Sequence, residues 1–370
     1  MLIGVPKEIK VHEYRVGLTP ESAAELIHAG QEVLVETGAG AGIGAEDAEY
    51  EAAGARIAPD AKTVFAKADM IIKVKEPQPA ECAMLREGQI LYTYLHLAPD
   101  PEQTKALIKS GAVCIAYETV TDDNGDLPLL KPMSQVAGRL AVQVGATALQ
   151  KVGGGRGVLL GGVPGVAPAK VVVIGGGDVG FNAAQMAVGL QADVTILDRD
   201  NVVMEQLSNH FGATAKVVRS TPAVLNELVR TADMVVGAVL IPGAAAPKLI
   251  TRDMLGTMMD GSVMVDVAID QGGCFETSKA TTHAEPTYVI DGVVHYCVAN
   301  MPGAVARTST YALNAATLSH AKNIARKGWK AALAADPHLL NGLNVCEGKL
   351  TYAAVGEALG IETVDPKTCL

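Results

Sequence analysis

The sequence predicts an α/β protein of two domains, one of which contains a six-stranded, doubly wound parallel sheet. Three observations favour this class. Strand and helix signals alternate along the chain, 370 residues are many for a single core, and a glycine-rich turn follows a buried strand near residue 175. Ligands of open α/β sheets bind beyond the carboxyl ends of the strands. We therefore expect the active site in a cleft between the two domains.

The first domain begins with a short strand at 2–5 and a helix that starts at Thr19-Pro20 and stops at Gly30. Pro suits the first helical position after a Thr cap, and Gly commonly ends a helix. Further strands are expected at 32–36, 70–74, 89–95 and 112–117, with helices between them at about 45–53, 60–68, 79–87 and 100–110. These elements predict a parallel α/β domain over residues 1–128.

The second domain is predicted over residues 129–305. A turn-rich segment at 122–128 marks the crossing between domains, and 133–149 has the pattern of a connecting helix. Six strand signals follow, and helices separate the first five: 170–174, 193–197, 214–219, 234–239, 262–267 and 293–298. Six strands are what two mononucleotide-binding halves need, in the order 3-2-1-4-5-6 of the Rossmann fold.

Beyond Pro302 the chain has a long helical stretch, about 304–334, which is expected to leave the sheet. We expect this helix and the tail from 341 to 370 to return to the first domain. That domain would then be discontinuous, with 306–370 as its second part.

The first strand of the second domain and the turn after it have the sequence Lys170-Val-Val-Val-Ile-Gly-Gly-Gly-Asp-Val-Gly180. Gly175 would make the tight turn, Gly177 would let a pyrophosphate approach the backbone, and Gly180 would allow close helix–strand contact. Asp198 ends the next strand, about 20 residues on, where an acceptor for a ribose hydroxyl is expected. A lone G-x-G-x-x-G is a weak signal, and its alternative is a structural turn. The whole strand–turn–helix–strand–acid unit predicts a dinucleotide site.

Composition excludes several other classes. The net charge is −10 and basic residues are scattered, which argues against a nucleic-acid surface. The six cysteines form no C-x-x-C pair, so we expect reduced thiols in a cytoplasmic protein and no metal ion. The N-terminus lacks the long apolar region of a signal peptide, and uninterrupted apolar runs are too short for a membrane span.

The nicotinamide end of a dinucleotide should meet the loops that follow three strands of the second domain. These loops are 239–243, 267–273 and 298–303, and Asp270 is the only carboxylate in them. It is a candidate for the chemistry, although an Asp before Gly272-Gly273 could equally cap a turn.

Three residues of the first domain are candidates for the facing wall: Arg15, Lys75 and His96, each in a loop or at a strand end. Taken singly, a strand-end Lys is usually a solvated charge and a lone His a structural hydrogen-bonder. Together, two cations suit a small carboxylate substrate. Histidine, which titrates near neutral pH, suits the proton transfer that accompanies hydride transfer.

Several blocks of the chain resemble alanine dehydrogenase, of the family shared with the nucleotide-binding subunit of transhydrogenase. The similar blocks are Ile3-Gly-Val-Pro-Lys-Glu8, Glu13-Tyr-Arg-Val-Gly-Leu-Thr-Pro20, Lys73-Val-Lys-Glu-Pro77, Thr93-Tyr-Leu-His-Leu-Ala98, Gly161-Gly-Val-Pro-Gly-Val166, Val265-Asp-Val-Ala-Ile-Asp-Gln-Gly-Gly273, Asn300-Met-Pro-Gly-Ala304 and Gly342-Leu-Asn-Val345. They extend over essentially the whole chain.

The resemblance implies an NAD-dependent oxidoreductase of amino-acid catabolism that converts L-alanine reversibly to pyruvate and ammonia. It also implies a homohexamer. Arg15 and Lys75 would bind the substrate, His96 would be the acid/base, and Asp270 would assist at the amino or carbinolamine centre. The implied cofactor contacts, beside Gly175, Gly177 and Gly180, are Ser134, Asp178, Val179, Asp198, Ser220, Val239, Leu240, Val267, Ala268, Ile269, Asp270, Lys279, Val298, Ala299, Asn300 and Met301.

Two positions depart from the family pattern. Val203 stands where Arg or Lys is common near the adenosine, and Ala299 replaces a Pro, which predicts a more flexible loop. Arg199, beside Asp198, would tolerate a 2′-phosphate, but the carboxylate of Asp198 would repel it, so NAD is expected rather than NADP.

Two alternative functions remain open at this stage. One is the nucleotide-binding subunit of a proton-translocating transhydrogenase, although the Arg-Gln loop expected there is not evident. The other is a non-catalytic NAD sensor, against which the intact set of Arg15, Lys75, His96 and Asp270 argues.

Overall fold

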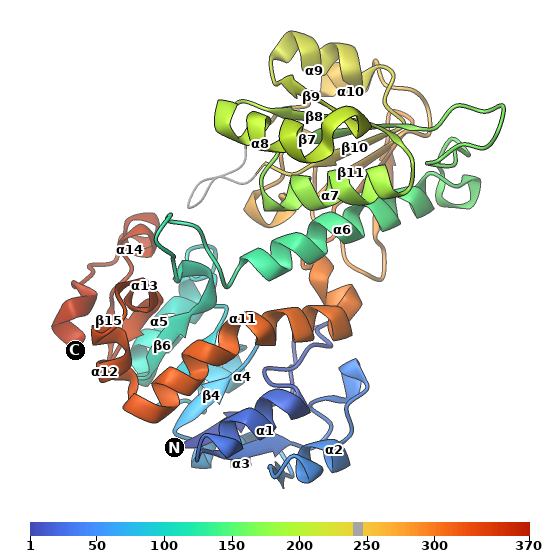
Figure 1. Ribbon diagram of the computed structural model, residues 1–370. Helices are drawn as coiled ribbons and strands as arrows, with labels where there is room; N and C mark the ends of the chain where they lie inside the picture. Colours follow the sequence, from blue (N-terminus) through green and yellow to red (C-terminus); the bar gives the residue numbers. More distant parts are fainter. Residues whose placement is uncertain (240–246) are drawn as a thin grey trace. The chain divides into compact units, whose positions relative to one another are not determined.

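The computed structural model describes residues 1–239 and 247–370 (Figure 1). The chain forms two compact units. Unit 1 comprises Met1–Met133 and Gly303–Leu370, and unit 2 comprises Ser134–Pro302. Each unit has its own sheet with helices packed against it. The predicted class, two α/β domains, is confirmed.

The sheet of unit 1 has eight strands in the order β15-β14-β6-β5-β4-β1-β2-β3. The six N-terminal strands pair in parallel, whereas β14 is antiparallel to both β6 and β15. The parallel pairing predicted for the strands of residues 1–128 is confirmed, and the antiparallel edge comes from the C-terminal tail, for which no strand was predicted. The bounds are β1 Leu2–Val5, β2 Glu32–Glu36, β3 Arg56–Ala58, β4 Met70–Ile72, β5 Ile90–Thr93, β6 Val113–Ala116, β14 Leu343–Cys346 and β15 Lys349–Leu350.

Helices cover both faces of this sheet, over two separate apolar clusters. Thr19 caps the first helix, accepting a hydrogen bond from the backbone N–H of Ser22. The long C-terminal helix breaks at Gly328, whose φ of 79° is left-handed. The helices are α1 Pro20–His28, α2 Asp47–Ala52, α3 Ala61–Lys67, α4 Pro79–Cys82, α5 Pro101–Ser110, α11 Ala306–Lys327, α12 Trp329–Ala334, α13 Pro337–Leu340 and α14 Ala353–Leu359.

The described part of unit 2 contains a seven-stranded sheet in the order β12-β13-β11-β10-β7-β8-β9. The six predicted strands lie in the expected 3-2-1-4-5-6 order, and β12 adds an antiparallel edge that was not predicted. The two-residue turn Asp291-Gly292 between β12 and β13 is the sequence signal that indicates this hairpin. The strands are β7 Lys170–Ile174, β8 Asp193–Asp198, β9 Ala215–Arg219, β10 Met234–Gly237, β11 Val263–Asp266, β12 Thr287–Ile290 and β13 Val293–Tyr296.

Helix α6, Lys131–Ala148, runs through the division between the units, and α7, Asp178–Gly189, follows the first strand of unit 2. Within unit 2, Gly138 of α6 lies so close to α7 that a Cβ would overlap the carbonyl oxygen of Val179. A glycine therefore lets the two helices pack closely. The other α-helices in the described part of unit 2 are α8 Asn201–Phe211, α9 Pro222–Val229 and α10 Arg252–Leu255.

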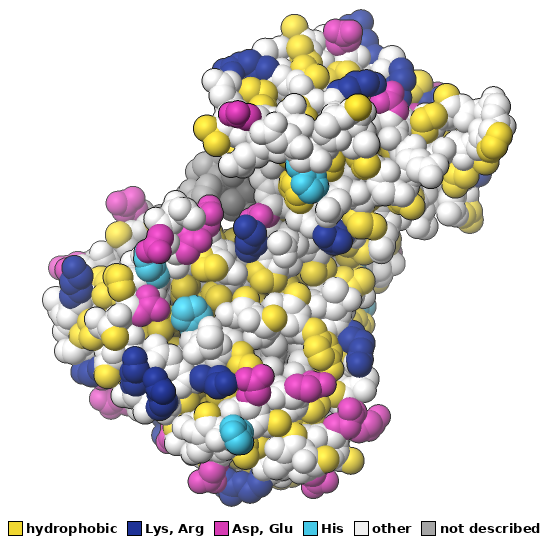
Figure 2. Space-filling model, in the orientation of Figure 1, with side chains coloured by type: hydrophobic (Ala, Val, Ile, Leu, Met, Phe, Trp, Pro, Cys, Tyr) yellow, Lys and Arg dark blue, Asp and Glu magenta, His cyan; other side chains and the backbone are white. Residues whose placement is uncertain are grey.

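Side chains of opposite charge are interspersed on the face of the described residues that Figure 2 draws. This distribution differs from the continuous basic stripe of a nucleic-acid surface. Every helix in the ranges 1–239 and 247–370 is too short or too polar to span a lipid bilayer.

A buried histidine should make unit 2 sensitive to acid. His295 of β13 is fully buried, with its ring nitrogens hydrogen-bonded to Thr277 and the carbonyl of Val293. Burial lowers the pKa of His295 below its usual 6.5. The unfolded chain then binds more protons than the folded one, so stability is lost as pH falls from about 6.5 through the lowered pKa.

We expect urea unfolding of the wild type to show a lower free energy of unfolding at about pH 5.5 than at about pH 7.5. In a His295→Gln variant the difference between the two pH values should be smaller. An unchanged difference would show that the acid sensitivity lies elsewhere.

Candidate active and cofactor sites

The glycine-rich turn of unit 2 has the geometry that a phosphate needs. Gly175 has a φ of 98°, which an L side chain rarely adopts. A Cβ at Gly180 would overlap the carbonyl oxygen of Gly175, so this helix position needs a glycine. At Gly177, by contrast, no atom lies within 4 Å of an added Cβ. This open space stands at the N-terminus of α7, where the N–H groups and the helix dipole favour an anion.

Asp198, at the end of β8, lies against this turn. Its carboxylate accepts hydrogen bonds from the backbone N–H of Gly176 (2.6 Å), Arg199 (2.6 Å) and Asp200 (2.9 Å). These contacts hold one carboxylate beside the phosphate-binding turn, as the recognition of a ribose requires. The residues present therefore fit a dinucleotide.

The other predicted cofactor residues also belong to unit 2, and they lie on several elements. Ser134 is half-buried on α6, Ser220 donates its backbone N–H to the carbonyl of Asp198 (2.7 Å), and Lys279 is exposed with Nζ 4.9 Å from the ring centroid of Tyr288. Val239 is half-buried after β10, and Leu240 lies outside the described residues.

The loop that was expected to be loosened by Ala299 has an extra anchor. The backbone N–H of Ala299 donates to the carbonyl of Thr281 at 3.3 Å, a bond that proline cannot make. The neighbouring Asn300 has a left-handed φ of 63°, and its carbonyl is hydrogen-bonded to His283. With Ala299 the loop lacks the fixed φ of a proline, but it gains a backbone hydrogen bond that a proline cannot make.

Asp270 lies in a short 3-10 turn, Ile269–Gln271, and its side chain is exposed. The turn is positioned by Asp266, a buried carboxylate at the end of β11 that sequence analysis missed. Asp266 accepts hydrogen bonds from the N–H groups of Ala268 (3.1 Å) and Cys274 (2.9 Å) and from the Ser278 hydroxyl. Burial raises the pKa of Asp266, although these hydrogen bonds oppose the rise. A lone acid in an apolar strand is the signal that could have indicated it.

In unit 1, the loop that carries Arg15 is tied to the returning helix α11. The backbone N–H of Val16 donates to Thr310, and that of Thr19 donates to Asn314 at 3.0 Å. Arg15 itself is buried, and its Nε and Nη2 each donate to a different carboxylate oxygen of Glu13 at 2.6 Å. Burial alone would lower the pKa of Arg15, but the bond and charge of Glu13 raise it, so the guanidinium stays charged.

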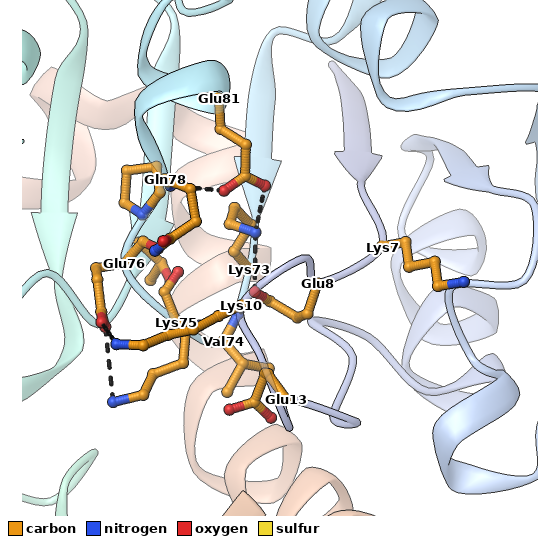
Figure 3. A network of polar contacts seen from close by, with 12 residues as sticks. Lys7, Glu8, Lys10, Glu13, Lys73, Val74, Lys75, Glu76, Gln78 and Glu81 are labelled. Carbon is orange, nitrogen blue, oxygen red and sulfur yellow. Dashed lines mark hydrogen bonds and ion pairs between the residues drawn. The ribbon is translucent and has the colours of Figure 1, made fainter. Parts of the chain in front are cut away.

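Lys75 lies beyond the end of β4, which stops at Ile72 rather than at the predicted residue 74. Its Nζ is 3.6 Å from Oε2 of Glu76, and Lys10 forms a second ion pair with the same carboxylate (Figure 3). Burial would raise the pKa of Glu76, but the charges of Lys75 and Lys10, with a smaller effect of His96, lower it. Glu76 is therefore an anion that holds two ammonium groups.

His96 also lies beyond its strand, since β5 ends at Thr93. Its ring stacks on Tyr94 with centroids 5.7 Å apart and planes 3° from parallel, and 40% of its side chain is exposed. Nδ1 is 3.8 Å from a carboxylate oxygen of Glu118. The hydroxyl of Tyr94 donates to the carbonyl of Leu129 at 2.6 Å, which fixes the stacking platform.

The three candidates of unit 1 share neighbours. Tyr94 stacks on His96. Burial raises the pKa of the Tyr94 phenol, and the positive charge of Arg15 opposes that rise. Glu76 responds to the charges of both Lys75 and His96. Arg15, Lys75 and His96 all lie in unit 1, whereas Asp270 lies in unit 2. The meeting of Asp270 with these three residues stays a prediction.

Two family models together match most of the chain. Residues 4–137 match the family model for the alanine dehydrogenase/PNT N-terminal domain, and residues 141–353 match that for the C-terminal domain. The chain belongs to the alanine dehydrogenase/PNT family. The resemblance seen in the sequence is thereby confirmed.

Relatives in the alanine dehydrogenase/PNT family match nearly the full length of the chain. An alanine dehydrogenase of Halomonas elongata is 62% identical over 99% of this chain and 98% of its own. One of Methanococcus maripaludis is 55% identical over 97% and 96%. A solved L-alanine dehydrogenase has a TM-score of 0.95 at 50% identity, covering 97% of this chain and 99% of its own. The transhydrogenase of Sinorhizobium meliloti has a TM-score of 0.82 at 26% identity, covering 96% and 100%.

Two glycines of α7 make a matched pair for testing the turn. Gly180→Ala should destabilise unit 2 by roughly 1–3 kcal/mol or more, because its Cβ overlaps the backbone of Gly175. Gly189→Ala, where the Cβ meets open space, should be neutral or stabilise by up to about 1 kcal/mol. Urea unfolding of both variants checks this. Equal stability of the two would contradict the close helix–turn contact.

Proposed function

We propose that this chain catalyses the reversible, NAD-dependent oxidative deamination of L-alanine to pyruvate and ammonia. One observation carries the proposal. The chain is 62% identical to an alanine dehydrogenase over 99% of its length. It carries two cations and a histidine, Arg15, Lys75 and His96, in one unit. Family membership and the dinucleotide-binding geometry of unit 2 add support for an NAD-dependent oxidoreductase.

In this proposal, Arg15 and Lys75 bind the substrate carboxylate and the neighbouring oxygen or nitrogen. Glu13 engages the Nε–Nη2 edge of Arg15, and Nη1 donates to the sulfur of Met133 at 3.1 Å. Glu13 thereby orients the cation. Lys75 supplies a point charge, and its 3.6 Å separation from Glu76 is loose enough for Nζ to turn toward a substrate oxygen.

His96 is proposed as the acid/base. Bound NAD supplies the acceptor for the hydride that leaves Cα of alanine. His96 then takes a proton from the water that adds to the resulting iminium, and returns one as the carbinolamine releases ammonia. The carboxylate of Asp270 is proposed to stabilise the cationic amino centre. Binding groups that hold the reacting atoms in contact can account for up to roughly 7–11 kcal/mol of the barrier.

Asp198 is proposed to select NAD over NADP. Its carboxylate stands at the end of β8 and is bound to the glycine turn through Gly176. A negative charge at this point accepts a hydrogen bond from a ribose hydroxyl and repels a 2′-phosphate. Arg199, whose N–H is bound to the same carboxylate, does not remove that repulsion.

The proposal extends to a cytoplasmic homohexamer. All six cysteines lie within the described residues and are free and buried, which suits a reducing compartment. The hexamer is inferred from family resemblance, and sedimentation of the purified protein tests it.

A spectrophotometric assay over a panel of small amino and 2-oxo acids, with NAD and NADP in parallel, tests the function. NADH should form with L-alanine and be consumed with pyruvate plus ammonia, and NADP should support much slower turnover. Tight binding of NAD without turnover of any amino acid would favour a non-catalytic sensor.

The likeness to the Sinorhizobium meliloti transhydrogenase supports a second candidate, the nucleotide-binding subunit of a proton-translocating enzyme. That function needs neither a substrate carboxylate site nor a histidine acid/base. Silence with alanine, together with hydride exchange between nucleotides when a partner subunit is added, would favour it.

A further inference from the structure

Two of the proposed functional residues share an unusual backbone environment. The N–H groups of Val74 and Lys75 both donate to one oxygen, Oε1 of Glu8, at 2.7 and 3.3 Å. The N–H groups of Leu95 and His96 both donate to Oε1 of Glu118, at 3.1 and 2.6 Å. In each case a single carboxylate holds the functional residue and the residue before it, and Leu95 also donates to Oε2 of Glu118 at 3.2 Å.

The need for such contacts follows from where the strands end. The strand β4 stops at Ile72 and β5 stops at Thr93, so neither Lys75 nor His96 lies within the bounds of a strand. The backbone there must still satisfy its N–H groups, and a carboxylate is a strong acceptor. His96 needs the support most, because its φ of 48° is left-handed and costly for a residue with a side chain.

Glu8 is itself held in place. The other oxygen of Glu8, Oε2, accepts a hydrogen bond from Nζ of Lys73 at 2.9 Å, and Lys73 also donates to Glu81 at 2.7 Å (Figure 3). All three side chains are buried. Glu81 contacts Lys73 and the N–H of Gln78, the N-cap residue of α4, but no contact links it to the backbone of 74 and 75.

We propose that Glu8 and Glu118 are positioning residues that set Lys75 and His96, respectively, for the reaction by fixing the backbone on which each side chain stands. This inference rests on the function proposed above. Glu8 acts on substrate binding, because Lys75 holds the substrate. Glu118 acts on proton transfer, because His96 is the acid/base.

The test compares Glu8→Ala and Glu118→Ala in steady-state kinetics with pyruvate, ammonia and NADH. A displacement of about 1 Å can cost roughly 100-fold. Glu8→Ala should raise KM for pyruvate by roughly 10–100-fold with a smaller effect on kcat. Glu118→Ala should lower kcat by a similar factor with a smaller effect on KM. Each variant is the other's control, since both remove a carboxylate near the same site.

Conservative variants separate positioning from general damage. Glu8→Gln and Glu118→Gln keep the acceptor oxygen, so each should recover most of the loss seen in the Ala variant. Glu8→Gln should still melt at a lower temperature, because Lys73 loses one of its partners. Glu81→Gln disturbs the same lysine without touching the backbone of 74 and 75, and its KM for pyruvate should stay near that of the wild type.

Three outcomes would overturn the inference: wild-type kinetics in both Ala variants, the same parameter changed in both, or no recovery by Gln in folded protein. Urea unfolding followed by circular dichroism reports that each variant is folded, because NAD binding would report on unit 2 alone whereas Glu8 and Glu118 lie in unit 1. A wild type that turns over no alanine or pyruvate would instead overturn the proposed function, so the two failures are distinguishable.

Discussion

His96→Ala is expected to lower the turnover of L-alanine by about 10²–10⁴-fold, the usual contribution of a positioned acid/base. The protein should still fold, because the side chain is 40% exposed and its main contact is stacking on Tyr94. NAD should still bind, because the glycine turn and Asp198 belong to unit 2. Turnover is measured by NADH formation at saturating alanine, and NAD binding by fluorescence titration.

The matched control is His338→Ala. His338 also belongs to unit 1 and also pairs with a carboxylate, that of Asp123, but this carboxylate is fully exposed. The second ring nitrogen of His338 is hydrogen-bonded to Thr121, which is half-buried, and neither partner is a proposed site residue. Removal of His338 should leave turnover unchanged. Full activity in the His96 variant would remove that residue from the mechanism, and a loss of equal size in both variants would indicate general damage.

Lys73→Met is expected to destabilise unit 1 by about 3–5 kcal/mol, because it leaves Glu8 and Glu81 as buried carboxylates without their cation. The pKa shifts support this expectation. Burial would lower the pKa of Lys73, but the two carboxylates raise it. Burial raises the pKa of Glu8, and the charge of Glu81 adds to the rise while Lys73 opposes it. One cation thus balances two acids in an apolar setting.

Chemical unfolding measures this effect, with Lys322→Met as the control. Lys322 pairs with Glu25 in the same unit, but both side chains are substantially exposed. An exposed pair contributes only about 0–1 kcal/mol. An equal loss of unfolding free energy in the two variants would show that burial does not strengthen the ion pairs of Lys73 with Glu8 and Glu81.

Much of the site was visible in the sequence because its residues lie in patterned surroundings. Gly175, Gly177 and Gly180 stand between a buried strand and a helix, and Asp198 ends the next strand, so spacing alone predicts their neighbourhood. Lys75 and His96 follow strands, and their positions beyond β4 and β5 differ only slightly from the prediction. A local sequence pattern is therefore sufficient to predict a site residue whose place depends on the order of strands and helices along the chain.

The carboxylates that support the site were missed for the opposite reason. Glu8, Glu118 and Asp266 look like ordinary acids in the chain, and only Asp266 is marked by an apolar strand. Their partners are backbone N–H groups, which every residue carries except proline, so no side-chain pattern points to them. Their role follows only from the hydrogen bonds.

The sequence by itself determined the α/β class, the order of the six parallel strands of unit 2 and the phosphate-binding turn. These depend on hydrophobic periodicity and on glycine positions, which are local properties. Tertiary structure alone decided that β14 pairs antiparallel with β6, that Glu13 holds one edge of Arg15, and that Lys73 lies between Glu8 and Glu81. Antiparallel pairing joins distant segments of the chain, and a charge pair joins two side chains. The energy of a charge pair depends on how deeply it is buried, and burial cannot be deduced from a short stretch of sequence.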